Sequence, residues 1–430
     1  MPSSAETSII RITSRSSPFE PCRSLVAMWV ALDDTDDRQG GCTTHVAHHL
    51  IETLTEDGHR VNPPRLVRLW PMAPHRTRGN AAVCFEVEGQ SMSEELLNRL
   101  WSQVEDLAQA GSSPALIVAR RQPPQDLYVR GVRGRIEEEE VDAWLLDEAQ
   151  VRTSRGGRGR IGATIALAWR AARATWETIA WRSPERVGTK RDVDREVVRA
   201  WSDHPDLIGM WDASRQRSLI QPHTPCPVLI GVRGWRPEAT DQATTDIASR
   251  PGTESPSGQR TFQSNQGSGD HLDSTFAGRL TAPPIRMGRS IRLETDAGTM
   301  VAWEKSGPVR GLALRLIEGD RIEAEGLHDE RGWIHLERLR FVERTQLDKP
   351  VRPKCRCGRR YESSGRSQNL RCRTCGTKVP SSWVDGRTPP SDAWVEPPER
   401  ARRHLAPWHQ PMTEPPHSKM TKMPSTLPRP

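Results

Sequence analysis

The sequence predicts an α+β protein built from several domains, and three observations support this. Strand-like and helix-like segments alternate through roughly the first 150 residues, which is typical of a sheet covered by helices. Short strand-like segments separated by turn residues follow between residues 285 and 343. Four cysteines then gather between residues 355 and 375. A chain of 430 residues is long enough for about two to four domains.

The composition favours a basic, cytoplasmic protein. The chain carries 62 lysines and arginines against 55 acidic residues, and only seven of these cations are lysines. Arginine suits phosphate and RNA better than lysine does, although a GC-rich genome explains the same excess equally well. No apolar run reaches the ~20 residues that cross a bilayer. Residues 1–27 lack the apolar core of a signal peptide, so we expect no contact with a membrane.

The first α/β domain is expected over residues 28–150, after a disordered extension at residues 1–27. Its predicted strands lie at residues 25–32, 65–70, 81–88 and 115–120, and its predicted helices at 43–56 and 93–111. Val46, Leu50 and Leu54 give the first helix an apolar face of helical period. Ser93 can cap the second helix and Gly111 can end it.

Two further domains are expected before the cysteines. A glycine-rich turn at residues 155–163 opens a second α+β domain over residues 151–280, with a helix, a strand at 175–181 and a low-complexity surface loop near 236–259. Five short strands over residues 281–346 predict a small barrel of the OB-fold type. The proline-rich residues 385–430 are expected to form a disordered tail.

The cysteine cluster predicts a zinc ribbon over residues 350–380. Cys355 and Cys357 form one short pair, and Cys372 and Cys375 form another pair after 14 intervening residues. Two thiolates from each pair can complete a tetrahedral structural Zn²⁺ site. Four free cysteines are the alternative. Many arginines surround the cluster, which suits contact with RNA phosphates.

Four aspartates stand where the first predicted strand ends. Asp33, Asp34, Asp36 and Asp37 would repel one another unless a cation neutralised them. Mg²⁺ takes one or two carboxylates together with phosphates, and the amides of the helix that begins near Thr43 favour phosphate. The stretch therefore predicts a Mg²⁺–polyphosphate site. A solvated acidic loop, with Thr43 as an ordinary helix cap, is the alternative.

Three other loops carry polar residues in unusual density. "HRTRGNAA" (75–82) and "RGGRGRIGA" (155–163) place arginines among glycines, an arrangement that cradles anions. His223 and Cys226 share a proline-stiffened turn, where such a pair is more often structural than catalytic, so no nucleophile is assigned there. "SNQGSGDHL" (264–272) gathers amides, an aspartate and a histidine in one loop.

Taken together and in order, these motifs resemble the archaeal tRNA-isoleucine 2-agmatinylcytidine synthetase family, TiaS. The resemblance covers roughly residues 28–380, from "ALDDTDDRQGGCTTH" through "RGGRGRIGATIALAW" and "PHTPCPVLIGVRG" to "SSGRSQNLRCRTCG". It implies an ATP-dependent kinase-like domain over residues 28–150 and a ferredoxin-like domain over 151–280, followed by an OB fold and a zinc ribbon. It also implies that agmatine is attached to C2 of the wobble cytidine of the CAU-anticodon isoleucine tRNA, while ATP is split to AMP and phosphates.

The resemblance implies roles for residues of the acidic stretch and the glycine loops. Asp33, Asp34 and Asp36 would hold ATP phosphates and Mg²⁺, with Asp33 and Asp36 as the magnesium ligands. Thr43 would accept a phosphoryl group, with the adjacent Thr44 as its rival. The remaining phosphate-binding residues would be Arg76, Arg78, Gly79, Asn80, Gly157, Arg158 and Gly159.

The sequence does not single out an agmatine pocket. Guanidinium and ammonium groups need carboxylates, and the candidates are Asp212, Glu177 and Asp270, with His271 beside the last of these. The chain departs from the family pattern at His45, Arg76, Ala81 and Thr224. No obligate protein partner is expected.

Two other functions compete with a tRNA-modifying ligase. A barrel with a zinc ribbon can bind nucleic acid without any chemistry, but such a protein does not need an acidic strand end. A Mg²⁺-dependent nucleotide phosphohydrolase would explain the N-terminal half, but not the barrel or the ribbon.

Overall fold

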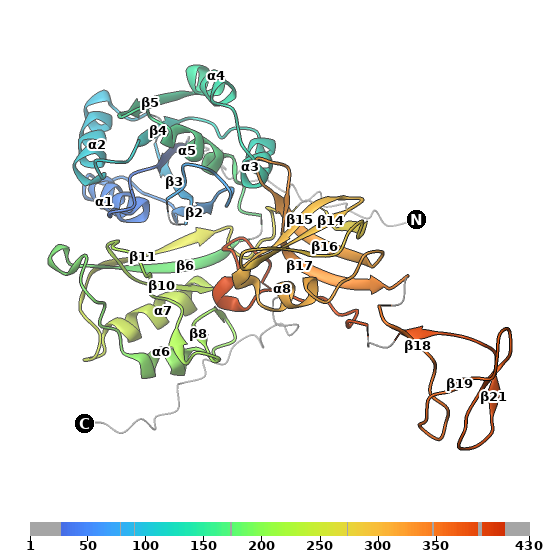
Figure 1. Cartoon of the computed structure of the whole chain (residues 1–430). Helices are drawn as coiled ribbons and strands as arrows, with labels where there is room; N and C mark the ends of the chain where they lie inside the picture. The colour runs from blue at the N-terminus through green and yellow to red at the C-terminus, as the bar shows by residue number, and fades with distance from the viewer. Residues whose placement is uncertain are drawn as a thin grey trace, which may run out of the picture.

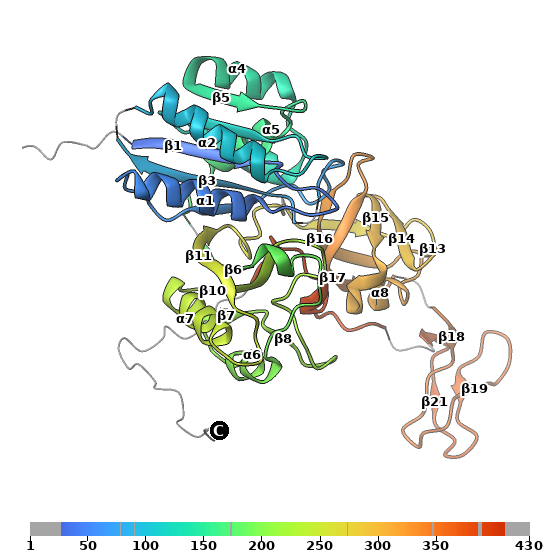
Figure 2. The same cartoon turned by 90° about the vertical axis from the view of Figure 1, so that its left-hand side faces the viewer.

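The computed structural model describes residues 27–77, 79–89, 91–172, 174–272, 274–345, 348–385 and 389–408. The expected disordered extension thus lies outside the described residues, apart from Ala27. Two sheet-and-helix units stack on each other, a barrel-like unit lies beside their junction, and a small cysteine-bearing unit projects away (Figures 1 and 2). Among the described helices, none is long and apolar enough to cross a membrane.

The first unit is a sheet with helices on both faces. Its elements are β1 (Ala27–Asp33), α1 (Thr43–Glu56), β2 (Arg65–Arg68), β3 (Ala81–Glu88), α2 (Glu94–Leu107), β4 (Ala115–Ala119), α3 (Gln125–Arg133), α4 (Glu138–Glu148), β5 (Ala149–Thr153) and α5 (Gly159–Ala168). The strands run antiparallel in the order β5-β4-β1-β3-β2. Val30 and Leu32 of β1 pack toward α1 and α2, whereas Ala31 packs toward α3, α4 and α5. The alternation of side chains along a strand thus buries both faces.

Most predicted elements of this unit are confirmed. The strand over residues 81–88 and the helix over 43–56 have the expected bounds. Ser93 caps α2 by accepting a hydrogen bond from the Leu96 amide at 3.1 Å. The prediction that Gly111 ends this helix is wrong, because α2 ends at Leu107. Gly111 instead donates its amide to Asp37 Oδ2 at 3.2 Å.

The domain boundary expected between residues 150 and 151 falls inside β5. This strand pairs with β4 from Ala115↔Thr153 to Ala119↔Ala149. The helix that was expected to open the second domain is α5, and its side chains Ile165 and Leu167 lie in the core of the first unit. The first unit therefore continues to about Trp169. Its strand β5 pairs with β4 at the sheet edge, and its helix α5 covers the face of β1 that carries Ala31.

The second unit is a smaller sheet with helices on one face. Its elements are β6 (Thr175–Arg182), a 3₁₀ helix η1 (Pro184–Arg186), α6 (Arg195–Trp201), β7 (Leu207–Ile208), β8 (Trp211–Asp212), β9 (Arg217–Ser218), β10 (Val228–Gly234), α7 (Pro237–Ala248) and β11 (Pro256–Ser264). The strand order is β11-β6-β10-β7, and α6 and α7 cover the face that carries Ala180 and Val232. The opposite face, with Ile179 and Trp181, packs into the core beneath α1.

One sheet runs through both units. β11 pairs in parallel with β2 through Gln263↔Arg65 and Ser264↔Leu66, which gives a nine-stranded sheet. The two units are visible as the upper and lower layers of Figure 1, with β2 and β11 facing each other. The carboxyl ends of β1 and β11 and the loop after β2 meet near this seam, where the polar loops gather.

The low-complexity loop expected near residues 236–259 is not a loop. Pro237 begins α7, where a missing amide proton costs nothing. Ala239, Ala243 and Ile247 recur at helical spacing and are buried. β11 begins at Pro256, so only residues 249–255 connect the two elements. The sequence of α7 consists mostly of small and polar residues, so its buried apolar face was not recognised.

The third unit is a curled sheet of the order β12-β16-β17-β15-β14-β13. Its elements are β12 (Phe276–Arg279), β13 (Ile285–Met287), β14 (Ser290–Thr295), β15 (Gly298–Ala302), a 3₁₀ helix η2 (Glu304–Ser306), α8 (Pro308–Ala313), β16 (Arg321–His328) and β17 (Ile334–Glu343). A bridge between Leu280 and Thr295 links the two sides of the curled sheet. Its core, including Ile291 and Leu339, is separate from the other cores.

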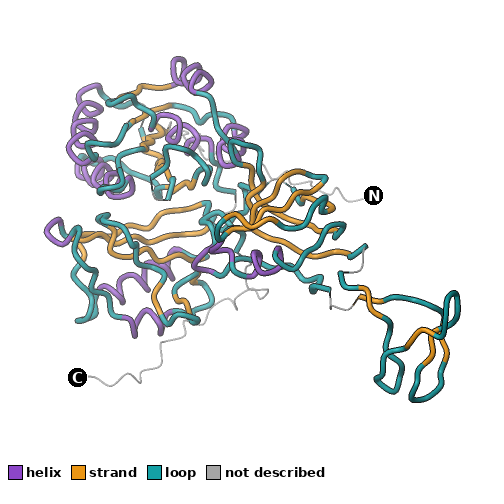
Figure 3. Tube along the Cα trace, in the orientation of Figure 1, coloured by secondary structure: helices purple, strands orange, loops and turns teal. Residues whose placement is uncertain are grey.

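The remaining chain makes a small projecting unit and then returns to the body. The projecting strands are β18 (Pro350–Val351), β19 (Glu362–Ser363), β20 (Leu370–Arg371), β21 (Lys378–Val379) and β22 (Val384–Asp385). Figure 3 shows that loops and short strands, without helices, make up this projection. The body is rejoined by residues 395–408, here named the C-terminal strap, which include the 3₁₀ helix η3 (Glu399–Ala401).

The prediction of a disordered tail over residues 385–430 is wrong for the strap. Val395 exchanges backbone hydrogen bonds with Leu339 of β17. Further on, Leu405 is 1% exposed in the core of the first unit. Proline-rich composition does not reveal such long-range pairing. Residues 409–430 lie outside the described residues.

Candidate active site

The aspartates follow β1 into a sharp turn beside α1. Asp34 has a positive φ of 55°, and its amide donates to Asp33 Oδ1 at 2.7 Å. Asp36 accepts hydrogen bonds from Thr77 Oγ1 at 3.0 and 3.1 Å. Asp37 accepts the amides of Gln39 and Gly40, so it shapes the turn. Asp37 is thus held by backbone amides, whereas the carboxylates of Asp33, Asp34 and Asp36 border a cavity.

Burial makes this acidic turn electrostatically costly. Burial and the neighbouring Asp34 raise the pKa of Asp33 well above its usual value. Burial also raises the pKa of Asp34, against the opposing effect of Arg158, whose Nη2 lies 3.7 Å from Asp34 Oδ2. A cation beside these carboxylates would relieve that cost.

The glycines of residues 155–163 allow α5 to approach the acidic turn. The helix begins at Gly159, and a Cβ atom there would overlap the Asp33 carbonyl. A Cβ at Gly162 would overlap the Asp33 carboxylate itself. Gly157, with φ of 60°, makes the turn that brings the helix start into place. The predicted glycine loop therefore lies against the predicted acidic site.

Two cavities flank Asp36. The first, of about 250 Å³, is lined by all three aspartates together with Arg76 and Arg158, and we name it the acidic cavity. The second, of about 330 Å³, lies between the two units and is named the Thr43 cavity. Both are bordered by Asp36, Thr77 and Asn80, so a ligand that spans them passes this point.

Thr43 lines the second cavity with Asp36, and it is not a helix cap. The N-cap of α1 is Cys42, which makes no capping side-chain bond. Thr43 Oγ1 instead accepts a hydrogen bond from Thr35 Oγ1 at 3.1 Å. Thr44 borders the same cavity and lies 3.0 Å from the Cys42 sulfur. The two threonines are therefore both near the acidic turn.

A charged network closes the floor of the Thr43 cavity. Glu177 on β6 accepts a bond from Arg68 Nη2 on β2 at 3.1 Å and another from the amide of Gln266. His404 of the strap lies 2.9 Å from Gln266, from Nδ1 to Oε1. Arg233 on β10 completes the lining on this side. Five segments that are distant in sequence meet here.

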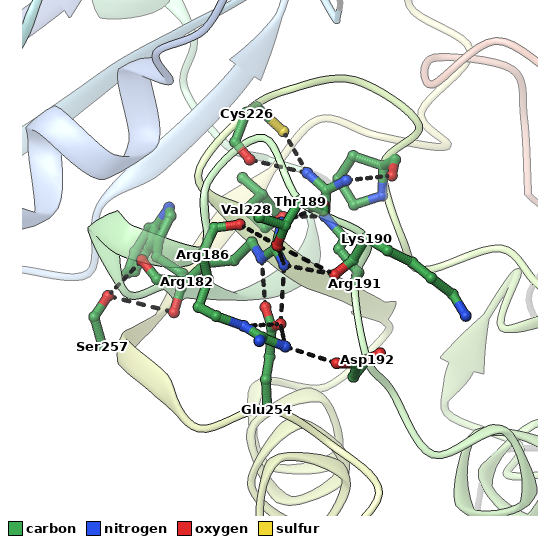
Figure 4. Close-up of polar contacts among 12 residues, drawn as sticks. Arg182, Arg186, Thr189, Lys190, Arg191, Asp192, Cys226, Val228, Glu254 and Ser257 are labelled. Carbon is green, nitrogen blue, oxygen red and sulfur yellow. Dashed lines mark hydrogen bonds and ion pairs between the residues drawn. The ribbon is translucent and has the colours of Figure 1, made fainter.

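The turn at residues 222–228 forms the cavity wall opposite α1. Arg191 donates to the carbonyls of Pro222, Thr224, Cys226 and Val228 at 2.8–3.0 Å. Figure 4 shows this guanidinium beneath the turn. Four backbone acceptors on one planar guanidinium fix the turn.

A buried ion-pair network lies beside Arg191 and supports it. Arg182 is fully buried and pairs with Glu254, which Arg186 also contacts at 3.0 Å (Figure 4). Arg182 donates further bonds to the carbonyls of Thr189 and Lys190. These bonds tie the end of β6 to the segment that carries Arg191, so the cavity wall is anchored in the second unit.

The four cysteines of the projecting unit converge as predicted. Each can offer one sulfur atom such that all four lie within 4.8 Å of one another. Cys355 and Cys375 are 3.3 Å apart between sulfurs, and Cys357 and Cys372 are 3.5 Å apart. Each close contact joins one residue from either pair, as a tetrahedral metal site requires. In the described chain, this is the one cluster with three or more ligands so close together.

Comparison with known families assigns this arrangement. The model of the TiaS TCKD domain matches residues 29–93, and that of the TiaS FLD domain matches residues 157–271. The isoleucine-tRNA 2-agmatinylcytidine synthetase TiaS of Methanopyrus kandleri is 32% identical over 88% of this chain and 95% of its own length. The chain belongs to the TiaS family. Its Archaeoglobus fulgidus member is 30% identical over 88% of this chain and 96% of its own length.

Solved TiaS structures share the fold over nearly the whole length. Apo TiaS, described as an isoleucine-tRNA agmatidine synthetase, has a TM-score of 0.73 at 28% identity, covering 90% of this chain and 97% of its own. The complex of TiaS with its isoleucine tRNA and ATP gives 0.74 at 28%, covering 89% and 96%. The complex with the same tRNA, AMPCPP and agmatine gives 0.72 at 26%, with the same coverage. The mixed α+β multidomain architecture is therefore that of TiaS.

The two TiaS domain matches meet at the site. The TCKD match contains most of β1, the acidic turn and α1, and the FLD match contains β6, β10 and the residues 264–271 loop. The FLD match also includes α5, although this helix packs on the first unit. The Thr43 cavity is thus walled by both matched regions.

The structure brings together some of the predicted site residues. Asp33, Asp34, Asp36, Arg76, Asn80 and Arg158 border the acidic cavity. Gly79 borders the Thr43 cavity, and Gly157 and Gly159 lie at the start of α5. Arg78 lies outside the described residues.

The agmatine candidates are scattered. Of the four, only Glu177 borders the Thr43 cavity. Asp212 accepts bonds from Ser214, and Asp270 accepts one from Tyr128 at 2.6 Å. His271 pairs with Glu337 of the barrel at 3.0 Å. Among the described lining residues of both cavities, Asp212, Asp270 and His271 are absent.

Sequence reasoning missed Arg68, Thr77, Arg233 and His404 around these cavities. Arg68 and Arg233 each sit among buried strand residues, and that interruption of an apolar run was a usable signal. Thr77 stands inside the motif at residues 75–82, whose arginines, glycine and asparagine were the residues predicted to bind phosphate. His404 gave no signal, because it follows a proline-rich stretch that does not predict a fold.

Proposed function

We propose that this chain is an ATP-dependent ligase that attaches agmatine to C2 of the wobble cytidine of the CAU-anticodon isoleucine tRNA. ATP would be split to AMP and phosphates, and the modified base would then pair with adenine. The observation that carries this proposal is the position of the acidic turn and Thr43 at the seam of the two TiaS-matched regions. Relatives at about 30% identity over most of the chain are named for this reaction.

The chemistry gives the two-part site its purpose. The C2 oxygen of cytidine is a poor leaving group, and a phosphoryl group makes it a good one. The primary amine of agmatine can then attack C2, and phosphate leaves with the bonding electrons. The protein contributes position and charge stabilisation during phosphoryl transfer.

The proposed roles follow the two cavities. Asp33 and Asp36 would hold Mg²⁺, which pairs with one or two carboxylates and with ATP phosphates, and Asp34 would lie beside them. Arg76, Arg158 and Asn80 would contact phosphates from the acidic cavity, with Gly79 at the neighbouring Thr43 cavity, while Gly157 and Gly159 would let the start of α5 come close to the phosphate site. Thr43 would accept a phosphoryl group during turnover.

The finer domain assignments are also part of the proposal. The first unit would be kinase-like, the second ferredoxin-like, the curled third unit an OB fold and the projecting unit a zinc ribbon. The convergent cysteines fit a structural Zn²⁺ ion by number, chemistry and spacing. The barrel and the ribbon would hold the tRNA, and the arginines that surround the cysteines support this.

Two alternatives explain less of the molecule. A non-catalytic nucleic-acid-binding protein would not need half-buried aspartates against glycine loops. A nucleotide phosphohydrolase would not need the barrel, the ribbon or a strap that joins them to the cavity.

A direct assay tests the proposal. The full chain is incubated with ATP, agmatine and a transcript of the isoleucine tRNA, and the wobble nucleoside is then isolated and weighed. We expect the mass of 2-agmatinylcytidine only when all three are present. ATP cleavage without any change in the nucleoside mass would favour the phosphohydrolase instead.

A further inference from the structure

The C-terminal strap carries His404 into the Thr43 cavity and fixes it there. The Gly267 amide donates to the His404 carbonyl at 2.8 Å, and the Gly269 amide donates to the Leu405 carbonyl at 2.8 Å. The Trp408 amide in turn donates a hydrogen bond to the Gly267 carbonyl at 3.1 Å. His404 therefore has a set position among the lining residues of a cavity that also contains Thr43.

A relay of hydrogen bonds determines the tautomer of His404. The amide nitrogen of Gln266 donates to Glu177, which leaves the amide oxygen of Gln266 facing His404 Nδ1 at 2.9 Å. This oxygen can only accept, so Nδ1 carries the proton. In a neutral imidazole the other nitrogen, Nε2, then has a lone pair. Nε2 lies on the side of Gly79, where a Cβ atom would be 3.9 Å away.

The surroundings keep this imidazole neutral. His404 is exposed to solvent at the cavity, yet Arg68, the surrounding protein and Arg233, in that order, lower its pKa well below the usual value. Glu177, the acidic group of this network, is bonded to Arg68. The cavity thus presents an unprotonated ring nitrogen to whatever enters it. Phosphates bound nearby would offset the two guanidinium charges and make this nitrogen a stronger base.

We propose that Nε2 of His404 takes the proton from the primary amine of agmatine as the amine attacks C2. This inference rests on the function proposed above. In the step, the amine nitrogen forms a bond to C2, the bond from C2 to the phosphorylated oxygen breaks, and phosphate leaves with the electron pair. The proton passes from nitrogen to Nε2 and then to water. Positioned general bases of this kind contribute about 10²- to 10⁴-fold.

Asp36, Glu177 and Cys42 in the same cavity are less suited to this role, and His223, which also lines the cavity, is the rival base. Both oxygens of Asp36 accept bonds from Thr77, and Glu177 is committed to Arg68 and Gln266. Burial raises the pKa of Cys42, so its sulfur remains a thiol. His404 differs from these because one of its nitrogens is fixed as a donor and the other is free to accept.

The test separates proton transfer from simple support. His404→Gly removes the ring, and His404→Gln places an amide oxygen that accepts a hydrogen bond but not a proton. We expect both variants to form 2-agmatinylcytidine about 100-fold more slowly in single turnovers, a larger loss than that of ATP cleavage in the same samples. Added imidazole should restore the rate of His404→Gly, and the more basic 4-methylimidazole should restore it further.

Controls make the outcome decisive. His328→Asn, an exposed histidine on the barrel, should match the wild type. A His404→Gln rate within threefold of the wild type would overturn the inference, as would a His404→Gly variant that imidazoles do not rescue. If His404→Gly does not fold, His404→Gln alone carries the test. Failure of the wild type to form the nucleoside would instead refute the proposed function.

Discussion

The imidazole of His48 stacks on the indole of Trp181, with ring centroids 4.6 Å apart and ring planes inclined by 17°. His48 lies on α1 and Trp181 on β6, so the stack joins the first unit to the second. Arg260 Nε donates to His48 Nδ1 at 3.0 Å, a bond that requires this nitrogen to be unprotonated. Burial and Arg260 lower the pKa of His48 to about 3.

This contact predicts acid-sensitive folding. Because the unfolded histidine titrates near 6.5, the unfolded chain binds more protons than the folded one between about pH 3 and 6.5. The free energy of unfolding should therefore fall as the pH drops through this window, by about 1–2 kcal/mol between pH 7 and pH 5. Urea melts at several pH values measure it. His48→Gln should flatten the dependence, and an unchanged slope in that variant would contradict the assignment.

Asp36→Asn should abolish ATP splitting while tRNA binding changes only a few-fold. Asp36 borders both cavities, and an amide cannot replace the charge that holds a metal ion against phosphates. AMP release and filter binding of tRNA give the two readouts. Asp37→Asn is the matched control, because Asp37 accepts backbone amides in the same turn. AMP release at the wild-type rate from Asp36→Asn would remove the metal role.

Thr43→Ala should lose cytidine modification, and peptide mass spectrometry after incubation with ATP should find phosphate on Thr43. The hydroxyl stands at the start of α1, where helix amides would stabilise an added phosphate. Thr44→Ala is the control, since Thr44 lines the same cavity. Phosphate on Thr44 alone, or full activity in Thr43→Ala, would refute the assignment.

Cys372→Ser should lower bound zinc and tRNA affinity together. The projecting unit has a small core, of which Leu370, Tyr361 and Cys372 form part, so metal binding should supply much of its folding energy. Atomic absorption and tRNA titration measure the two effects. ATP cleavage without tRNA should persist, because the cavities are built by other units. Absence of stoichiometric zinc from the wild-type protein would contradict this prediction.

Leu405→Ala should destabilise the protein by about 2–4 kcal/mol, as truncation of a buried leucine commonly does. Leu405 is 1% exposed, whereas Leu146, which is 85% exposed, offers a matched control. Thermal or urea melts compare the two variants. Equal stability of Leu405→Ala and Leu146→Ala would mean that the strap is not part of the folded body.

Local patterns predicted the elements well where local energetics decide them. The apolar spacing of Val46, Leu50 and Leu54 placed α1, and these side chains do face the core. The same reasoning failed for α7, whose buried face is made of Ala239, Thr240, Ala243, Thr244 and Ile247. Such small side chains carry little hydrophobic contrast. Burial against β10 and β6, which a local pattern cannot reveal, supports this helix.

Only part of the candidate site could be predicted from the sequence, for a similar reason. Aspartates at a strand end and glycines before a helix carry their chemistry in a short stretch, so Asp33, Asp36 and Gly159 could be identified. The floor of the Thr43 cavity is built from residues that are far apart in the sequence. Gln266 and His404, for example, are 138 residues apart and still form a hydrogen bond. Only the folded chain brings these two side chains together.

The pairing of Leu339 with Val395 makes the cysteine-bearing projection an insertion between two neighbouring points of the barrel. A segment whose two ends already lie together can be lengthened, shortened or exchanged at little entropic cost, since closing a longer loop costs only about 0.6 kcal/mol per doubling. The catalytic body should then tolerate excision of residues 348–385 and their replacement by a short glycine–serine bridge. In evolution, this module can change in length and surface while the cavities stay unchanged.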